Sequence, residues 1–170
     1  MDDLIQRLKD FRDNLPTIIG EAATLVSGSA KAIAERRIKE SGFNESYSDA
    51  KYPAWFLIGE ELNQAGLSFL KTKKENDEPT NWAELRESQG LQSAHVDLSY
   101  SNEMWSGMQP QEPYELNGAI VAPLAHTNTA GQRKMNYNFE RYGDFIGKVL
   151  NEEDMEMLAE IAIEYIAKKI

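Results

Sequence analysis

The sequence has no cysteine, only two histidines and six prolines, and no long run of apolar residues. Without cysteine the chain can form no disulfide, no thiolate metal site and no cysteine nucleophile. No apolar stretch approaches the roughly 20 residues that a membrane-spanning helix needs. The opening residues 1–4 (Met-Asp-Asp-Leu) carry acids where a secretory signal carries basic residues. We therefore expect neither a cleaved signal nor a membrane anchor.

Basic residues are also scarce. Eighteen Lys and Arg stand against 28 Asp and Glu, which gives a formal net charge of -10 at pH 7. Binding to phosphate backbones or anionic membranes depends on clustered cations. This chain has only short basic clusters, such as Arg133-Lys134 and the lysines of 71–74. We expect an acidic, soluble protein that binds neither nucleic acid nor a membrane and whose charge favours basic partners.

The length of 170 residues suits one domain with a hydrophobic core of its own. The 41% hydrophobic and 27% charged content indicates a foldable chain with a polar surface. We expect a single domain over residues 1–170 with an elaborated helical and loop region at 42–90. Within that region, residues 71–80 have no apolar anchor, which predicts an exposed excursion.

Apolar residues at three- and four-residue steps predict a long helix over residues 2–41. This stripe consists of Leu4, Leu8, Phe11, Leu15, Ile18, Ala22 and Leu25. Pro16 lies inside the stripe and lacks an N–H, so we expect a kink or break near Leu15. Residues 1–15 suit two roles, as part of the core or as an arm that reaches a neighbour, and the pattern leaves both open.

Local signals place the remaining elements. Residues 57–70 predict a short helix, and a second one, capped by Thr80 or Asn81, should end near Gly90. The alternation over 95–100 predicts a half-buried strand, and a short helix should hold residues 104–108. The dipeptide Asn117-Gly118 predicts a hairpin between strands at 114–116 and 119–122.

The segment 124–135 reads as a polar loop, and the final helix begins after Asn151. That residue is a good N-cap, and three acids follow it in the first turn, where the helix dipole favours anions. A buried stripe is expected at Leu158, Ile161, Ala162, Tyr165 and Ile166. The predicted class is α+β: a long N-terminal helix, a small antiparallel sheet, short helices in the middle, and a C-terminal amphipathic helix.

Few residues could carry catalysis. His95 lies two residues from Asp97, and with His126 they would supply a two-histidine, one-carboxylate metal set. Nothing in the sequence fixes the spacing of the three, so a surface or hydrogen-bonding role for each histidine is the stronger interpretation. The sequence contains no Gly-x-Ser-x-Gly, Walker or Gly-x-Gly-x-x-Gly motif. We therefore expect no catalytic residue, no cofactor and no metal site.

Two places favour binding to other proteins. The aromatic group Tyr52, Trp55 and Phe56 is of the kind enriched at interface hot spots, although it could equally cap the core beneath a loop. The pair Arg133-Lys134 could dock on an acidic partner or lie solvated in a loop. These five residues are our candidate partner-binding residues.

The C-terminal two-thirds of the chain resembles the tail-completion and virion-morphogenesis proteins of tailed bacteriophages. Four segments carry the resemblance: the Ala-rich, Arg-ended helix at 30–37, the segment 96–104, the hairpin strand 118–122, and the segment 140–147 before the acidic helix start. The sequence departs from the family in three ways. Ser101-Asn102 stands where Thr-Gly is usual, Tyr142-Gly143-Asp144 replaces a single proline, and the region 42–90 is longer.

The resemblance implies a structural virion protein without cofactor or catalysis. Such subunits form homo-oligomeric rings, here of six or twelve copies, in the neck between the portal or its adaptor and the tail. DNA would pass nearby without specific binding. The expected location is the virion's head-tail connector, after assembly in the host cytoplasm. Two alternatives stay open: an acidic intracellular module that inhibits a basic nuclease or toxin, and a small metal-dependent enzyme built on His95, Asp97 and His126.

Overall fold

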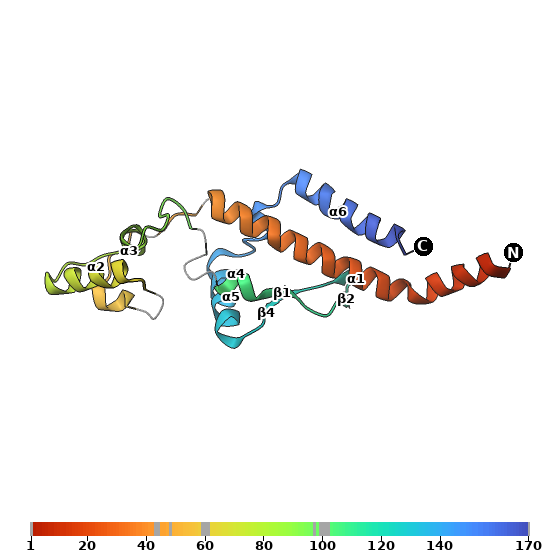
Figure 1. Ribbon diagram of the computed structural model, residues 1–170, viewed down its shortest axis with the longest axis horizontal. Helices are drawn as coiled ribbons and strands as arrows, with labels where there is room; N and C mark the ends of the chain where they lie inside the picture. Colours follow the sequence, from red (N-terminus) through yellow and green to blue (C-terminus); the bar gives the residue numbers. More distant parts are fainter. Residues whose placement is uncertain are drawn as a thin grey trace. The chain divides into compact units, whose positions relative to one another are not determined.

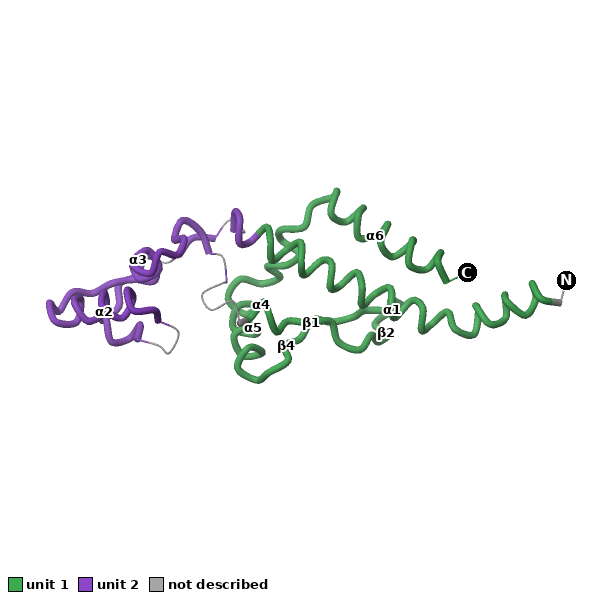
Figure 2. The backbone as a smooth tube through the Cα atoms, viewed as in Figure 1, with its two compact units in different colours: residues 1–37, 102–170 green, residues 38–101 purple. Residues whose placement is uncertain are grey.

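The computed structural model describes residues 2–42, 45–47, 49–58, 62–96, 98 and 103–169 (Figure 1). The fold is α+β with helices predominating, which confirms the predicted class. The chain divides into two compact units, the first formed by residues 1–37 with 102–170 and the second by residues 38–101 (Figure 2). The elaborated region expected at 42–90 lies within the second unit.

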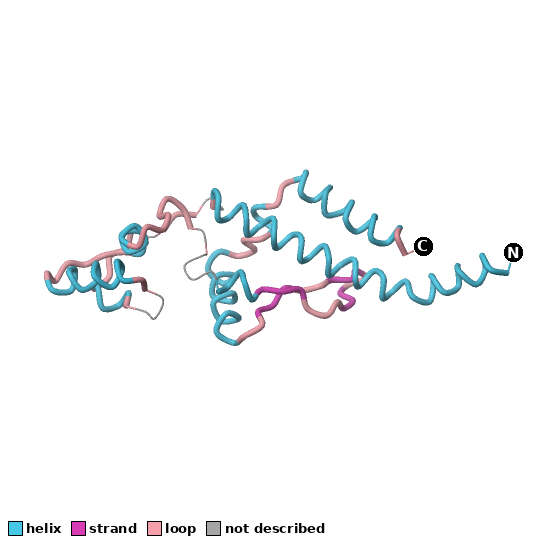
Figure 3. The backbone as a smooth tube through the Cα atoms, viewed as in Figure 1, coloured by secondary structure: helices cyan, strands magenta, loops and turns pink. Residues whose placement is uncertain are grey.

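Helix α1 runs without interruption from Asp2 to Ser41, with Pro16 inside it. A break near Leu15 is therefore absent, and the helix instead changes direction within its N-terminal part (Figure 3). The missing N–H of Pro16 removes one hydrogen bond, to the carbonyl of Arg12, and the turns on either side keep the helix continuous.

Helix α6, Glu152–Ala167, lies beside α1 in the first unit. Its N-terminus is closed by a capping box, as predicted: Asn151 Oδ1 accepts from the Asp154 N–H at 2.8 Å, and Asp154 Oδ2 accepts from the Asn151 N–H at 2.9 Å. Near the other end, the Tyr165 hydroxyl donates to Glu21 at 2.5 Å. Of the predicted stripe, Leu158 is buried and the other four side chains are half-buried.

Two small antiparallel sheets follow α4, Glu103–Gly107. Strand β2, Tyr114–Leu116, pairs with β3, Ala119–Val121, across the predicted Asn117-Gly118 turn. Both turn residues have positive φ, 51° and 82°, as a tight two-residue hairpin requires. The second pair was not predicted: β1, Met108–Pro110, aligns with β4, Leu124–His126. Met108 thus opens a strand rather than extending the short helix.

Helix α5, Thr129–Tyr142, occupies most of the segment predicted as a polar loop, so that prediction was wrong. Asn128 caps it by accepting from the Gly131 N–H at 2.8 Å. A short 3-10 turn, η2, Gly147–Val149, precedes α6. The first unit's aromatic core joins these elements: Trp105 and Phe145 are fully buried and meet edge to face with ring centroids 5.9 Å apart.

The second unit contains the 3-10 turn η1, Ala54–Leu57, and the helices α2, Gln64–Glu75, and α3, Trp82–Ser88. Its core consists of Ala54, Leu57, Leu70 and Leu85. Helix α3 begins after the predicted cap Asn81 and ends before Gly90, whose φ is 73°.

The excursion expected at 71–80 is exposed over residues 71–79 apart from half-buried Lys73, but it is ordered: α2 continues to Glu75, and the segment ends at the fully buried Thr80. Another prediction for the second unit was wrong. The strand expected at 95–100 is not formed by the described residues, because Leu98 has a φ of 54°, which an extended strand cannot contain. Asp97, Ser99 and Tyr100 lie outside the described residues.

Candidate interaction surfaces

The 3-10 geometry of η1 sorts its four residues between core and solvent. With three residues per turn, positions three apart share a side, and Ala54 and Leu57 are both buried. The two residues between them, Trp55 and Phe56, are 63% and 59% exposed. Together with the exposed Ile58 they form what we call the aromatic surface.

The rings of this region order one another. Tyr52 and Phe56 stack with centroids 5.3 Å apart, and Trp55 meets Phe56 edge-on at 6.2 Å. Tyr52 is half-buried against the Leu57 core cluster. Of the two roles that the sequence left open for these aromatics, Tyr52 therefore covers the core, while Trp55 and Phe56 face solvent.

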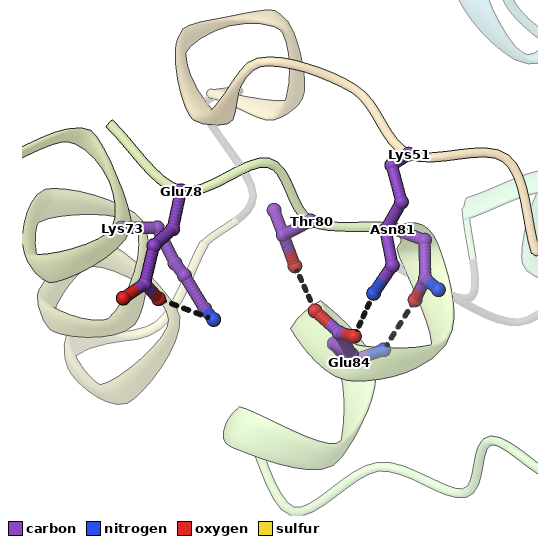
Figure 4. A network of polar contacts seen from close by, with 6 residues as sticks. All are labelled: Lys51, Lys73, Glu78, Thr80, Asn81 and Glu84. Carbon is purple, nitrogen blue, oxygen red and sulfur yellow. Dashed lines mark hydrogen bonds and ion pairs between the residues drawn. The ribbon is translucent and has the colours of Figure 1, made fainter. Parts of the chain in front are cut away.

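A polar network holds the backbone that carries the aromatic surface (Figure 4). Tyr52 and Thr80 exchange backbone hydrogen bonds of 2.7 and 2.9 Å. The buried Thr80 hydroxyl donates to Glu84 at 2.6 Å, and Glu84 also pairs with Lys51. Lys51 and Thr80 both favour the ionised carboxylate, so the pKa of Glu84 lies below its ordinary value. The charge of Glu84 thus links the strand-like segment at 51–52 to α3.

A second ion pair fixes the segment predicted as an excursion. Lys73 contacts Glu78 at 2.8 Å and lies 5.7 Å from the Phe69 ring centroid. The hydrogen bond to Glu78 raises the pKa of Lys73 above its ordinary value. Residues 76–78 therefore fold back on the end of α2 rather than forming an unanchored tip.

The structure places Arg133 and Lys134 on helix α5, in its second turn, and not in a loop. Arg133 is exposed, whereas Lys134 is half-buried. Adjacent helix residues point about 100° apart, so the two cations do not share one face. Tyr137, one turn after Arg133, is 57% exposed and its hydroxyl accepts from Arg141 at 3.0 Å.

Each histidine serves the local fold. His126 Nδ1 accepts from the Asn128 N–H at 3.0 Å, and its ring fills the space beside Gly107 and Gly131. His95 lies 3.4 Å through Nε2 from the Lys39 carbonyl. The hydrogen-bonding interpretation made from the sequence fits both side chains.

The proposed metal set is not assembled by the described residues. His95 belongs to the second unit and His126 to the first, and Asp97 lies outside the described part of the chain. Across the described ranges, no group of three or more His, Asp or Glu side chains could hold a metal ion.

The structure shows two further exposed apolar surfaces. The sequence left the role of the one on α1 open, and it did not lead us to predict the one on α6. On α1, Leu4 and Leu8 are 59% and 55% exposed. On α6, Met155 and Ile163 are 57% and 66% exposed; Ile163 lies on the side away from the predicted stripe, whereas Met155 lies at its edge. A signal for the α6 surface does exist in the sequence, since residues 155, 159, 163 and 167 are all apolar at four-residue steps.

Among the residues that the structure describes, no helix is long and apolar enough to cross a membrane. The surfaces described above are candidate sites for protein contacts, because exposed apolar side chains that lie together mark interaction sites: the aromatic surface, the exposed face of α5, and the outward sides of α1 and α6. Comparison of the chain with protein-family models, curated proteins and solved structures found no match.

Proposed function

We propose that the chain is a structural, non-catalytic subunit of a tailed-bacteriophage virion, a tail-completion or neck protein that joins the portal or its adaptor to the tail. The observation that carries the proposal is the element order of the first unit. A long N-terminal helix, a small antiparallel sheet region and a C-terminal helix follow one another in the order that the family resemblance implies. The resembling segment 118–122 falls on β3, and the segment 140–147 covers the end of α5 and the turn that holds Phe145 of the aromatic core.

The distribution of exposed apolar side chains also supports a role in assembly. Most large apolar residues of a soluble monomer are covered, and contiguous exposed ones mark interaction sites. Here both units carry them: Trp55 and Phe56 in the second, Leu4, Leu8 and Ile163 in the first. A subunit held between two neighbours and a partner ring would need several such surfaces.

The proposed partners are other copies of this chain, in a ring of six or twelve, together with portal or adaptor and tail proteins. The proposed location is the virion neck, reached from the host cytoplasm during assembly. With a net charge of -10, such a ring would repel the DNA that passes through it. The role requires no cofactor, no membrane and no small-molecule substrate.

The first test is the mass of the native species, by light scattering after size exclusion, for the purified chain and for virion or neck extracts. A species of six or twelve subunits in either sample, and the chain's presence in purified virions, are expected. A monomer in every setting, together with its absence from virions, would overturn the proposal.

The acidic charge favours one other function, an intracellular module that inhibits a basic nuclease or toxin. Opposite charge across an interface speeds association and makes it sensitive to salt. This alternative predicts a monomer that forms a tight one-to-one complex with a single basic protein, with affinity that falls steeply between about 50 and 500 mM salt. A ring-forming chain that binds no such protein would exclude it.

A further inference from the structure

One face of helix α1 is buried over part of its length and uncovered over the rest. Ile18 and Ala22 are 7% and 3% exposed, and both face the interior of the first unit. Continuing toward the N-terminus at the same three- and four-residue steps leads to Leu15, Phe11, Leu8 and Leu4. Exposure rises along this stripe, from half-buried Leu15 and Phe11 to 55% at Leu8 and 59% at Leu4. We call residues 2–15 the arm.

The cover supplied by α6 ends within the arm, near Phe11. Lys169, just beyond the end of α6, lies 3.4 Å from Glu21. The same lysine lines a shallow hollow with Phe11 and Ile18. In Figure 1 the arm continues past this end of α6. The apolar face that packs at Ile18 is therefore left uncovered at Leu8 and Leu4 by the residues that the structure describes.

Helix α6 carries an exposed apolar row that starts at the edge of its buried stripe and winds round to the opposite side at Ile163 and Ala167. Met155, Ala159, Ile163 and Ala167 follow at four-residue steps, and all four are exposed. We call them the outer row. Asp154 and Tyr165, which bind α1, lie on the other side of the helix from Ile163, because 3.6 residues make one turn. The arm is part of α1 and cannot reach the outer row of its own α6.

The charges beside the two stripes are complementary. At 100° per residue, Arg12 lies along one edge of the arm's stripe and Arg7 along the other, where Asp3 and Asp10 are its neighbours; Asp13 lies opposite the stripe. The row next to the outer row consists entirely of exposed glutamates: Glu152, Glu156, Glu160 and Glu164. The present partner of Arg12 is the neighbouring, exposed Asp13 at 2.7 Å, and such surface pairs are weak enough to be exchanged.

We propose that the arm of one copy of this chain docks on the outer row of a neighbouring copy. Leu4 and Leu8 would pack against Met155 and Ile163, with Arg12, at one edge of the arm's stripe, facing the glutamate row. The lengths match: the arm spans about 21 Å and the 16-residue α6 about 24 Å at 1.5 Å per residue. This contact deepens the proposed function and rests on it for its place in the virion.

The contact is head-to-tail, because the arm and the outer row are different surfaces of the same chain. Heterologous contacts of this kind close into rings when the rotation between copies allows it. One helix-on-helix contact is small compared with the roughly 1,600 Å² of a stable interface. Each contact is therefore weak alone, and closure of the ring, in which every copy makes two contacts, stabilises the assembly.

The test uses two single variants of the full chain. Leu8→Glu places a charge in the arm's stripe, and Ile163→Glu places one in the outer row. Each should weaken self-association about tenfold or more, measured by sedimentation over a range of concentrations. Leu67→Glu changes another exposed leucine, 44% exposed on α2, and should leave self-association unchanged. Circular dichroism checks that all three variants fold.

Mixing the two variants gives the sharper result. A Leu8→Glu copy keeps its outer row and an Ile163→Glu copy keeps its arm, so the mixture can form one contact and should give one-to-one dimers but no ring. If arms instead paired with arms, the Ile163→Glu variant would associate as the wild-type chain does. Adding the Leu8→Glu variant would then not increase association. That outcome, or a wild-type chain that stays monomeric up to about 1 mM, would overturn the docking.

The outcomes separate this inference from the proposed function. Virions that contain the chain and still incorporate the Leu8→Glu and Ile163→Glu variants would support the neck assignment and contradict the docking. Complementation between the two variants, for a chain that is absent from virions, would support the docking and contradict the neck assignment.

Discussion

Arg37 and Asp154 join the two longest helices of the first unit, with Arg37 Nη2 2.8 Å from Asp154 Oδ1. The Asp154 side chain is only 3% exposed, whereas that of Arg37 is 32% exposed. The second carboxylate oxygen of Asp154 accepts from the Asn151 N–H in the capping box. A single buried carboxylate therefore closes the start of α6 and holds that start against α1.

Removing the arginine should leave this carboxylate buried without its cation. We expect Arg37→Ala to lower the free energy of unfolding of the first unit by about 2 kcal/mol, less than for a fully buried pair because Arg37 is partly hydrated. Urea unfolding followed by Trp105 fluorescence, with Trp55 and Trp82 replaced by Phe, reports on this unit alone.

The exposed neighbour Arg36 supplies the control for that measurement. Arg36→Ala should change stability by no more than about 0.5 kcal/mol. Equal effects of the two substitutions would contradict the role assigned to the Arg37–Asp154 pair.

The elements that were predicted correctly depend on signals within a few residues. Asn81 and Asn151 cap their helices, and Asn117-Gly118 turns its hairpin, because each acts through its own backbone or that of the next three residues. The β1–β4 pair escaped prediction because its strands are three residues each and are separated by the whole hairpin. No local pattern specifies such a pairing.

Helix α5 was missed for a different reason. Its first turns contain Gly131, a residue that weakens helices, and the preceding polar residues are typical of a loop. The structure explains the glycine by the close approach of the His126 ring. Helix propensity describes the preference of each residue's own backbone. It cannot report that the His126 ring, five residues away in sequence, packs so closely against position 131 that only glycine fits.

The candidate sites were predictable in composition but not in orientation. The sequence singles out Trp55 and Phe56, yet only the 3-10 turn decides that these two face solvent while Leu57 faces the core. Arg133 and Lys134 were expected in a loop, which gives no relative direction for their side chains. On helix α5 the two side chains point apart.

Two helical glycines should respond in opposite directions to alanine. A Cβ at Gly131 would lie 2.0 Å from His126 Cε1, so Gly131→Ala must displace a buried ring and should cost about 1–3 kcal/mol. A Cβ at Gly28 in α1 would meet Pro110 at 3.5 Å, an ordinary contact. Gly28→Ala should therefore stabilise the chain, by up to about 1 kcal/mol from helix propensity.

Thermal unfolding of the two variants tests this contrast, and a double variant tests its cause. If the clash with the ring is responsible, Gly131→Ala should cost much less in a His126→Ala background than in the wild-type chain. A penalty that persists undiminished without the ring would point to a requirement of the α5 backbone instead.

The charge of Glu84 should make the second unit more stable at neutral than at acid pH. Its hydrogen bonds from Lys51 and Thr80 lower the pKa below the ordinary value of 4.5. A carboxylate whose pKa is depressed on folding stabilises the fold above its unfolded pKa, and that contribution is lost as the pH falls through the folded pKa. Glu84→Gln should therefore destabilise at pH 7 by up to about 1 kcal/mol, as for partly exposed pairs.

The pH dependence of the difference is the decisive measurement. The wild-type chain and Glu84→Gln should converge in stability as the pH falls through the lowered folded pKa of Glu84, where the carboxyl of the wild-type chain becomes protonated. Glu75→Gln is the matched control, since Glu75 lies 3.9 Å from Lys71 in an exposed pair on α2 and should show little effect at either pH. A difference for Glu84→Gln that is constant from pH 3 to pH 7 would show that its charge is not responsible.

Neighbouring residues of η1 should separate stability from binding. Leu57 is 2% exposed, so Leu57→Ala removes core contacts and should cost about 2–5 kcal/mol. Trp55 is 63% exposed, and Trp55→Ala should change the free energy of unfolding by less than about 1 kcal/mol.

If the aromatic surface is a docking site, Trp55→Ala should nevertheless reduce incorporation into purified virions severalfold, because exposed Trp residues dominate many interfaces. Quantitative mass spectrometry of virions assembled with each variant measures this. Trp82→Ala, which changes a tryptophan that is 38% exposed outside the aromatic surface, serves as the comparison. Normal incorporation of a folded Trp55→Ala chain would mean that the aromatic surface is not the site by which this subunit joins its partners.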